Sequence, residues 1–211
     1  MTQSKYASLE KLFSQMKRMK NDPLAEAGTN IVLSRGNPKA RLLIVGEAPG
    51  PEENKQGKPF VGRAGQMLDQ ILRSANFAPE TDVFITNSVF RMPPGDAGKT
   101  FRKPTLKEIE FYRPFVFEII RLVDPLIILL TGNVACLSVL EQSGITSLHG
   151  KWIQKDGHWI MPIFHPSYLL RNPISEPGSP KALMRDDLKK VRKKYDQLLK
   201  KKSYFKNTMS L

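Results

Sequence analysis

Cysteine is almost absent from this 211-residue chain, which contains one, Cys136. A single thiol cannot form an intramolecular disulfide, and it excludes a Cys-rich zinc or iron–sulfur site built from this chain alone. Long apolar runs are absent too: the longest extends from Leu126 to Leu130, far short of the roughly 20 residues that cross a bilayer. The N-terminus lacks the apolar region of a signal peptide. These absences predict a cytoplasmic protein without membrane association.

Acidic residues are the minority of the charged residues, with 20 Asp and Glu against 33 Lys and Arg, so the formal net charge is +13. The excess lies at the ends of the chain. Residues 41–180 carry 15 basic and 14 acidic side chains, whereas residues 181–211 carry 11 basic and 3 acidic ones. A basic segment of this density favours phosphates or an acidic surface. A solvated helix face with a frayed tail explains the same charge, and charge alone does not name a partner.

Short apolar runs alternate along the chain with segments of helical periodicity, a pattern that predicts a parallel sheet covered by helices on both faces. We therefore expect a three-layer α/β/α sandwich around a central, mainly parallel four-stranded sheet. An N-terminal helix in residues 1–29 precedes this domain of residues 30–199, and a basic tail in residues 200–211 follows it. The expected strands are residues 41–46, 82–87, 125–131 and the arms of a hairpin around Asp156-Gly157. A long loop is expected between the first strand and Arg63. The expected helices are residues 8–20, 64–76, 104–123 (broken or kinked at Pro114), 132–142 and 182–201.

Polar side chains follow the apolar strands at the ends where ligands bind in sheets of this class. Glu47 comes directly after the first expected strand, Asn87 ends the second, and His165 follows the hairpin. Because the carboxyl ends of parallel strands meet at one edge, a carboxylate, an amide and an imidazole should converge there. The sequence therefore predicts a site at this edge.

Two glycine-rich segments suggest nucleotide binding but fail in detail. Gly46-Glu-Ala-Pro-Gly50 lacks the G-x-G-x-x-G pattern and leads into a loop, which argues against a dinucleotide site. The segment from Pro93 to Thr100 resembles a P-loop, but a proline occupies the place of its first glycine, so a mobile basic loop is expected instead. A zinc deaminase would also act on nucleobases, and the cysteine count excludes it.

Three longer segments resemble the motifs of one family. They are Gly46-Glu-Ala-Pro-Gly-Pro-Glu-Glu-Asn-Lys-Gln-Gly-Lys-Pro-Phe-Val-Gly-Arg-Ala-Gly-Gln-Met-Leu-Asp69, Thr86-Asn-Ser-Val-Phe-Arg-Met-Pro-Pro94 and His165-Pro-Ser-Tyr-Leu-Leu-Arg-Asn-Pro173. In this order they resemble the uracil-DNA glycosylase superfamily, in particular its bacterial and archaeal family 4. The resemblance implies a DNA repair enzyme that flips uracil out of DNA, hydrolyses its N-glycosidic bond and leaves an abasic site.

The resemblance assigns three residues to recognition of the base. Phe60 would stack on the flipped uracil, Asn87 would hydrogen-bond its edge with one donor and one acceptor, and Gly46 would border the same pocket. Each assignment has a structural alternative. Phe60 is also explained as a core aromatic under the loop, and Asn87 as a residue that turns the chain after its strand.

Three further residues are expected to act in catalysis under this resemblance. His165 would stabilise the departing uracil anion by hydrogen bonding. Glu47 would hold the water or stabilise the cationic sugar, and Glu53 would close the pocket against the methyl group of thymine. A structural histidine at a strand end is the alternative for His165.

The loop after His165 is expected to enter the minor groove, where an apolar wedge occupies the gap left by the flipped base. Leu169 or Leu170 would be this wedge unless both belong to the core, and the basic C-terminal segment would add an anchor on the DNA backbone. The full set of expected DNA contacts is Ser167, Leu169, Leu170, Arg171, Lys99, Arg102 and Lys103.

The chain departs from family 4 at the positions of its iron–sulfur cluster. Most members bind a [4Fe–4S] cluster through four cysteines. The matching positions here are Met19, Asp22, Arg91 and Tyr112. None supplies a thiolate, so we expect no cluster and no other cofactor, with side-chain packing in its place.

Two other departures bear on the reaction. Asn54 replaces the acid that usually stands beside Glu53 and takes part in water activation. A related branch traps DNA covalently through a histidine after the Pro-Pro segment, and residues 95–104 contain none. We therefore expect a monomeric hydrolase acting on uracil-containing DNA; the alternative is a catalytically weakened homologue that binds damaged or single-stranded DNA. A contact with a polymerase clamp is left open by the sequence.

Overall fold

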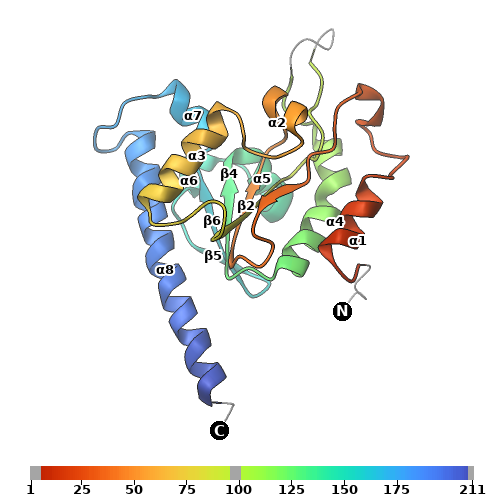
Figure 1. Ribbon diagram of the computed structural model, residues 1–211. Coiled ribbons are helices and arrows are strands. Elements are labelled where there is room, and N and C mark those ends of the chain that lie inside the picture. The colour runs from red at the N-terminus through yellow and green to blue at the C-terminus, as the bar shows by residue number, and fades with distance from the viewer. Residues whose placement is uncertain (1–5, 96–100, 209–211) are drawn as a thin grey trace.

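The computed structural model describes residues 6–95 and 101–208 and places them around a six-stranded sheet with the order β1-β3-β2-β4-β6-β5 (Figure 1). Strands β2, β3, β4 and β6 are parallel, and the edge strands β1 and β5 pair antiparallel with β3 and β6. The expected parallel centre is confirmed, but the expected total of four strands is wrong. The strands are β1 (Ser34–Gly36), β2 (Leu42–Gly46), β3 (Val83–Asn87), β4 (Ile127–Thr131), β5 (Ile153–Lys155) and β6 (His158–Ile163).

Length and burial explain why the sequence pattern predicts the central strands and omits β1. The edge strands have three residues each and are half-buried or exposed, too short for a visible alternation. Strands β2, β3 and β4 are buried along their whole length, so they appear as continuous apolar runs. The predicted turn between β5 and β6 is confirmed: Asp156 and Gly157 have φ of 49° and 84°, as a type I′ hairpin turn requires.

The five predicted helices are present, and the structure adds the short helices Ala25–Ala27, Ile145–Leu148 and Pro166–Arg171, the last of them in the loop predicted after His165. Three further differences concern α2, α4 and α8. A short helix, α2, lies within the predicted long loop, opened by Pro51 and ended by Gly57 at φ 68°. Helix α4 continues without a break through Pro114, and α8 continues to Thr208, beyond its predicted end. The helices are α1 (Leu9–Met16), the 3-10 helix η1 (Ala25–Ala27), α2 (Pro51–Gln56), α3 (Arg63–Ser74), α4 (Leu106–Val123), α5 (Gly132–Leu140), α6 (Ile145–Leu148), α7 (Pro166–Arg171) and α8 (Pro180–Thr208).

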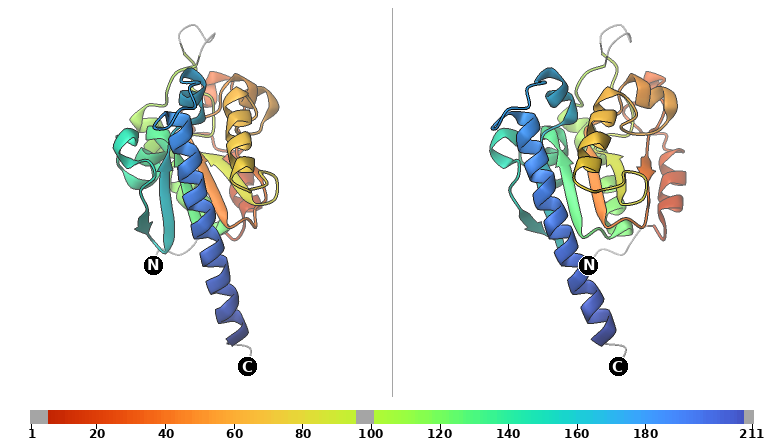
Figure 2. Two further views of the ribbon diagram at one scale, coloured as in Figure 1. Left: turned by 90° about the vertical axis from the view of Figure 1, so that its left-hand side faces the viewer. Right: turned by 60° about the vertical axis from the view of Figure 1, so that its left-hand side comes forward.

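Helices cover both faces of the sheet, which confirms the three-layer sandwich (Figure 2). Leu43 and Val45 of β2 belong to a core formed with α1, α4 and α5, while Leu42 and Ile44 belong to a second core formed with α3, α7 and α8. Successive side chains of one strand point to opposite faces. Each apolar residue of a central strand therefore serves one of the two cores.

Helix α8 begins beside α7, crosses one face of the sheet next to α3, and then extends past the body of the molecule (Figures 1 and 2). Its buried apolar residues are Met184, Leu188, Val191 and Tyr195. Its C-terminal end lies at the opposite end of the molecule from α2 and α7 (Figure 1). Within residues 6–95 and 101–208, no helix is both long and apolar enough to span a bilayer.

Candidate active site

The carboxyl ends of the parallel strands bring the predicted catalytic and base-binding residues together. Gly46 ends β2 and Asn87 ends β3, and the two residues are directly paired in the parallel ladder. Glu47 follows Gly46, and His165 follows β6 after Phe164. Glu47, Phe164 and His165 line one cleft of about 710 Å³, which is within the usual size of a ligand pocket. The cleft therefore opens where a ligand site is expected in this class of sheet.

Asn87 and Phe60 both pack directly against Gly46. A Cβ atom at Gly46 would collide with Oδ1 of Asn87 and with the edge of the Phe60 ring, so both side chains lie directly beside the glycine. Asn87 is only 2% exposed, yet its side-chain amide has no hydrogen-bond partner among the described residues. An unpaired buried amide is costly in free energy. A ligand edge that offers one acceptor and one donor would satisfy it.

The loop that carries Phe60 is held by Glu53 in a conformation that a non-glycine residue rarely adopts. Phe60 has φ of 54°, and its carbonyl group approaches Gly65 so closely that a Cβ atom there would collide with it. Oε1 of Glu53 accepts hydrogen bonds from the N–H groups of Val61 (2.9 Å) and Gly62 (2.8 Å). Such strain persists only where the surroundings over-determine it. Glu53 thus positions the Phe60 loop, and its expected contact with the methyl group of thymine stays a prediction.

His165 is held in one tautomer by the start of α7. The backbone N–H of Ser167 donates to Nδ1 of His165 at 3.2 Å, and the Ser167 hydroxyl lies 2.8 Å from the same atom. Because a backbone N–H can only donate, Nδ1 accepts, and the neutral ring carries its proton on Nε2. The ring centre lies 5.9 Å from that of Phe60. His165 therefore offers an Nε2–H donor next to the ring expected to hold the base.

Burial and two cations set the charge states of His165 and Glu47. Burial, reinforced by Arg171 and Lys103, lowers the pKa of His165 to about 4, so the imidazole is neutral near pH 7. Burial raises the pKa of Glu47 above its ordinary value, while Lys103 and Arg171 oppose this rise. A neutral donor and a carboxylate of increased basicity suit a reaction in which a base leaves as an anion and water attacks.

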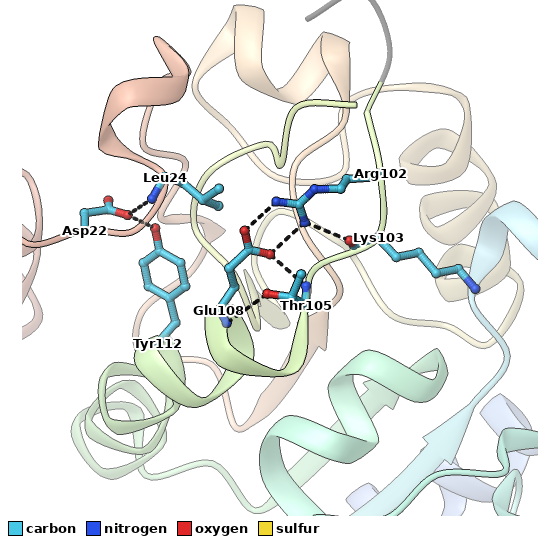
Figure 3. A network of polar contacts seen from close by, with 7 residues as sticks. All are labelled: Asp22, Leu24, Arg102, Lys103, Thr105, Glu108 and Tyr112. Carbon is cyan, nitrogen blue, oxygen red and sulfur yellow. Dashed lines mark hydrogen bonds and ion pairs between the residues drawn. The ribbon is translucent and has the colours of Figure 1, made fainter. Parts of the chain in front are cut away.

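The basic residues predicted before α4 divide into different roles. Arg102 is bound to Glu108 by two hydrogen bonds of 2.8 and 2.6 Å, and Glu108 also caps α4 through Thr105 (Figure 3). Lys103 points away from this pair, lines the cleft and forms no ion pair among the described residues, although its charge acts on Glu47 (Figure 3). Lys99 lies outside the described residues. Arg102 therefore holds the segment in place, and Lys103 is the cation placed to meet a phosphate.

The two leucines of the predicted wedge, Leu169 and Leu170, differ in burial on helix α7. Leu169 has no exposed surface and belongs to the core shared with α3 and α8, so the structure places it inside the protein and not at a DNA surface. Leu170 is half-buried, whereas Tyr168 and Arg171 are exposed and line the cleft. The backbone N–H and the hydroxyl of Ser167 both contact Nδ1 of His165, so this serine orients the imidazole.

Gly132 and Phe101 are two of the cleft residues to which the sequence motifs assign no role. Gly132 follows β4 with φ of 82°, and a Cβ atom there would lie 3.1 Å from Cβ of His165, so the glycine permits their close approach. Its position directly after an apolar strand is the sequence signal that could have identified Gly132. Phe101 also lines the cleft and is 56% exposed. No pattern in the sequence marks Phe101, because its exposure depends on how the surrounding loops fold.

Three of the four positions that match the cluster cysteines of family 4 belong to one polar network centred on Asp22, and Figure 3 shows two of them, Asp22 and Tyr112. The carboxylate of Asp22 is buried; its Oδ2 accepts a hydrogen bond from Nε of Arg91 at 2.6 Å. Its Oδ1 accepts from the Tyr112 hydroxyl and from the backbone N–H of Leu24 (3.0 Å; Figure 3). Met19 is half-buried against the same core. Three of the four positions therefore contact one another directly.

This donor set does not fit an iron–sulfur cluster. A [4Fe–4S] cluster is held by thiolates, and these positions offer a thioether, a carboxylate, a guanidinium and a phenol. Burial and the bond to Asp22 raise the pKa of Tyr112, so its hydroxyl stays protonated. Over the part of the chain that the structure describes, no group of three His, Cys, Asp or Glu side chains is placed to hold a metal ion.

Comparison with known proteins agrees with the geometry. A family profile described as "Uracil DNA glycosylase superfamily" matches residues 33–189. The chain is 36% identical over 173 residues to a type-4 uracil-DNA glycosylase of Thermotoga maritima, which covers 80% of this chain and 86% of that protein. It is 34% identical over 194 residues to a type-4 uracil-DNA glycosylase of Sulfurisphaera tokodaii, covering 88% and 84%. A segment of a DNA polymerase of Bacillus phage SP01 is 31% identical over 152 residues, which is 72% of this chain and 16% of that protein.

The family profile spans most of the chain, and its ends enclose every residue that lines the cleft, from Glu47 to Arg171. The two bacterial and archaeal relatives are matched over more than four-fifths of their own length. The segment that the family shares therefore contains the strand ends, the unpaired Asn87 amide and the neutral His165. The chain belongs to the uracil-DNA glycosylase superfamily.

Proposed function

We propose that the protein is a monofunctional uracil-DNA glycosylase of base excision repair, which flips uracil out of DNA, hydrolyses its N-glycosidic bond and leaves an abasic site. The observation that carries this proposal is the buried, unpaired amide of Asn87 beside Gly46 and Phe60. Uracil presents O4 as an acceptor and N3–H as a donor, which one amide satisfies together. Phe60 provides the aromatic face on which the base stacks, a contact that contributes roughly 1 to 3 kcal/mol.

The reaction follows from the two groups with shifted pKa values. The C1′–N1 bond breaks with its electron pair on uracil, and the sugar becomes oxocarbenium-like. Nε2–H of His165 donates to O2 of the departing anion, which spreads the negative charge. A water oxygen bonds to C1′ while Glu47 accepts the proton of that water, and the uracil anion finally takes up a proton.

The DNA backbone is held at the rim of the cleft in this proposal. Arg171 and Lys103 are exposed cations that line the cleft and meet phosphates on either side of the flipped nucleotide. Leu170 is the candidate wedge on α7, since Leu169 is in the core. The enzyme acts as a monomer in the cytoplasm.

The alternative of a weakened homologue depended in part on Asn54. Its Oδ1 accepts a hydrogen bond from the backbone N–H of Asn30 at 2.7 Å, and its carbonyl accepts one from the Asn30 side chain at 2.8 Å. Asn54 therefore ties α2 to the segment before β1. No observation at this position favours a loss of activity, so the active enzyme is the function we propose.

A duplex oligonucleotide with one uracil tests this function. We expect the full-length protein to release uracil and leave a site that alkali cleaves, visible as a shortened strand on a denaturing gel. A matched oligonucleotide with thymine should stay intact, because the pocket is expected to exclude its methyl group. Binding to the uracil duplex without cleavage would support the weakened homologue, and neither binding nor cleavage would refute both functions.

The enzyme works without an iron–sulfur cluster in this proposal. The Asp22 network joins the segment before η1, the segment after β3 and helix α4. These are the chain segments that the cluster would connect in other family members. A buried ion pair with added hydrogen bonds gives the same mechanical connection without a metal.

Replacing Arg91 with leucine should lower the free energy of unfolding by about 3 to 5 kcal/mol, because the Asp22 carboxylate is left buried without its cation. For a chain of this size the expected fall in Tm is about 6 to 20 °C, measured by scanning calorimetry. Arg73 pairs with Glu80 at the surface, where both side chains are more than half exposed. Arg73→Leu, the matched control, should cost less than about 1 kcal/mol. Equal losses for the two variants would contradict a structural role for the network.

A further inference from the structure

Phe101 is a large apolar side chain that stays exposed at the rim of the cleft. Five large apolar side chains are exposed among the described residues, and three of them, Phe101, Leu106 and Tyr168, line this cleft. Scattered exposed apolar residues are ordinary, but a group around one cleft indicates a binding surface. Phe101, 56% exposed, is the least covered aromatic ring in this group.

The backbone around Phe101 is fixed, so the ring is held out from the core. Phe101 forms a β-bridge with Pro94, and the next N–H, that of Arg102, donates to the Pro93 carbonyl at 3.2 Å. The Arg102 side chain is then bound twice to Glu108. Paired residues in succession point to opposite sides. Since Arg102 turns toward Glu108, Phe101 faces away from that contact.

Positive charge surrounds the ring. Lys103, two residues further along the chain, lines the same cleft without forming an ion pair among the described residues, and Arg171 lines it from α7. An aromatic ring between exposed cations is the arrangement by which proteins hold unpaired nucleotides: the ring stacks on a base and the cations hold the backbone. This surface suits a nucleic-acid strand better than an apolar protein partner.

We infer that Phe101 stacks on the nucleobase next to the flipped uracil in the same strand. The inference rests on the proposed function. When uracil enters the pocket beside Phe60, the neighbouring base loses a stacking partner and exposes one π-face. Phe101 covers that face, and Lys103 meets the adjoining phosphate. The residue would thus stabilise the flipped state from the side of the cleft opposite α7.

The variant Phe101→Ala tests the inference when KM and kcat are measured separately on a uracil-containing duplex. We expect KM to rise roughly 5- to 150-fold, the range of one lost base–aromatic stack, with kcat within a few-fold of the parent. Phe101→Trp should restore KM, and Phe101→Leu, which is apolar without a π-face, should not. Ile174→Ala is the matched control, because Ile174 is 60% exposed and does not line the cleft.

A second measurement separates this inference from the proposed function. Fluorescence anisotropy of a labelled, uracil-free single strand reports binding without catalysis, and Phe101→Ala should weaken it while Ile174→Ala should not. Loss of strand binding in Phe101→Ala would support the inference even if the parent protein released no uracil. An unchanged KM and unchanged strand binding in Phe101→Ala, or full rescue by leucine, would overturn it.

Discussion

Asn87→Ala is expected to lower kcat/KM on uracil-containing DNA by about 30- to 10⁴-fold, because two polar groups of the base are left buried and unpaired at about 1 to 3 kcal/mol each. The amide is buried, unpaired and adjacent to Gly46 and Phe60, so no residue is placed to replace it. Single-turnover kinetics of abasic-site formation measures the loss. Far-ultraviolet circular dichroism should show an unchanged fold, because the amide makes no hydrogen bond within the described protein.

Asn87→Asp sharpens this test, because it keeps the shape of the side chain and replaces its donor by an acceptor. The carboxylate cannot donate to O4 of uracil, but it can accept from the N4 amine of cytosine. We therefore expect loss of uracil release and a gain of weak activity on cytosine. Asn37→Ala serves as the control, since Asn37 binds the Thr81 carbonyl away from the cleft. Wild-type rates in Asn87→Ala would refute its role in base recognition.

His165→Ala should lower kcat by about 10²- to 10³-fold, the usual effect of removing one donor to a developing anion. Ser167→Ala should give a smaller loss, because it removes the hydroxyl near Nδ1 but keeps the backbone N–H that fixes the tautomer. His158→Ala is the control: its Nδ1 lies 2.7 Å from the Pro125 carbonyl, at the other end of β6. A His165→Ala enzyme with parental kcat would exclude the imidazole from the chemical step.

The pH dependence of kcat/KM provides a second readout for the same residue. The pKa of His165 is about 4, so the ring is neutral at every pH above about 5 and contributes no limb to the profile there. The acidic limb should come from Glu47, whose ionised form accepts the proton of water and whose pKa is raised by burial. Activity should therefore fall as the pH falls through a value above that of an exposed glutamate. Arg171→Gln should move this limb to higher pH, since Arg171 lowers the pKa of Glu47.

Much of the fold could be predicted because the central strands are buried on both faces. A strand such as Leu42–Gly46 has no solvent face, so it must be apolar throughout, and its polar successor marks the strand end. For the same reason the sequence predicts that Glu47, Asn87 and His165 lie at one edge of the sheet. Strand β1 was not predicted, because a three-residue edge strand with mixed burial carries no distinctive pattern, whereas the Asp156-Gly157 turn indicated the equally short β5.

Other features depended on contacts between distant residues, which a linear pattern does not contain. Asp22, Arg91 and Tyr112 are isolated substitutions in the sequence and become a network only when the segment before η1, the segment after β3 and helix α4 meet. Leu169 and Leu170 are equivalent in the sequence, and burial separates them. Arg102 and Lys103 are likewise two adjacent cations until one of them binds Glu108.

The sequence alone shows that the chain has a single cysteine and an excess of basic residues. The single cysteine excludes a cluster held by thiolates, and the basic excess favours a polyanionic partner. The tertiary structure decided where these properties act. The cluster positions hold an ion pair, and the basic end of α8 extends away from the cleft (Figure 1). Among the described residues the cations that line the cleft are Arg102, Lys103 and Arg171, of which Arg102 is bound to Glu108. Composition fixes which groups exist, whereas folding fixes which of them become buried, paired or free to meet DNA.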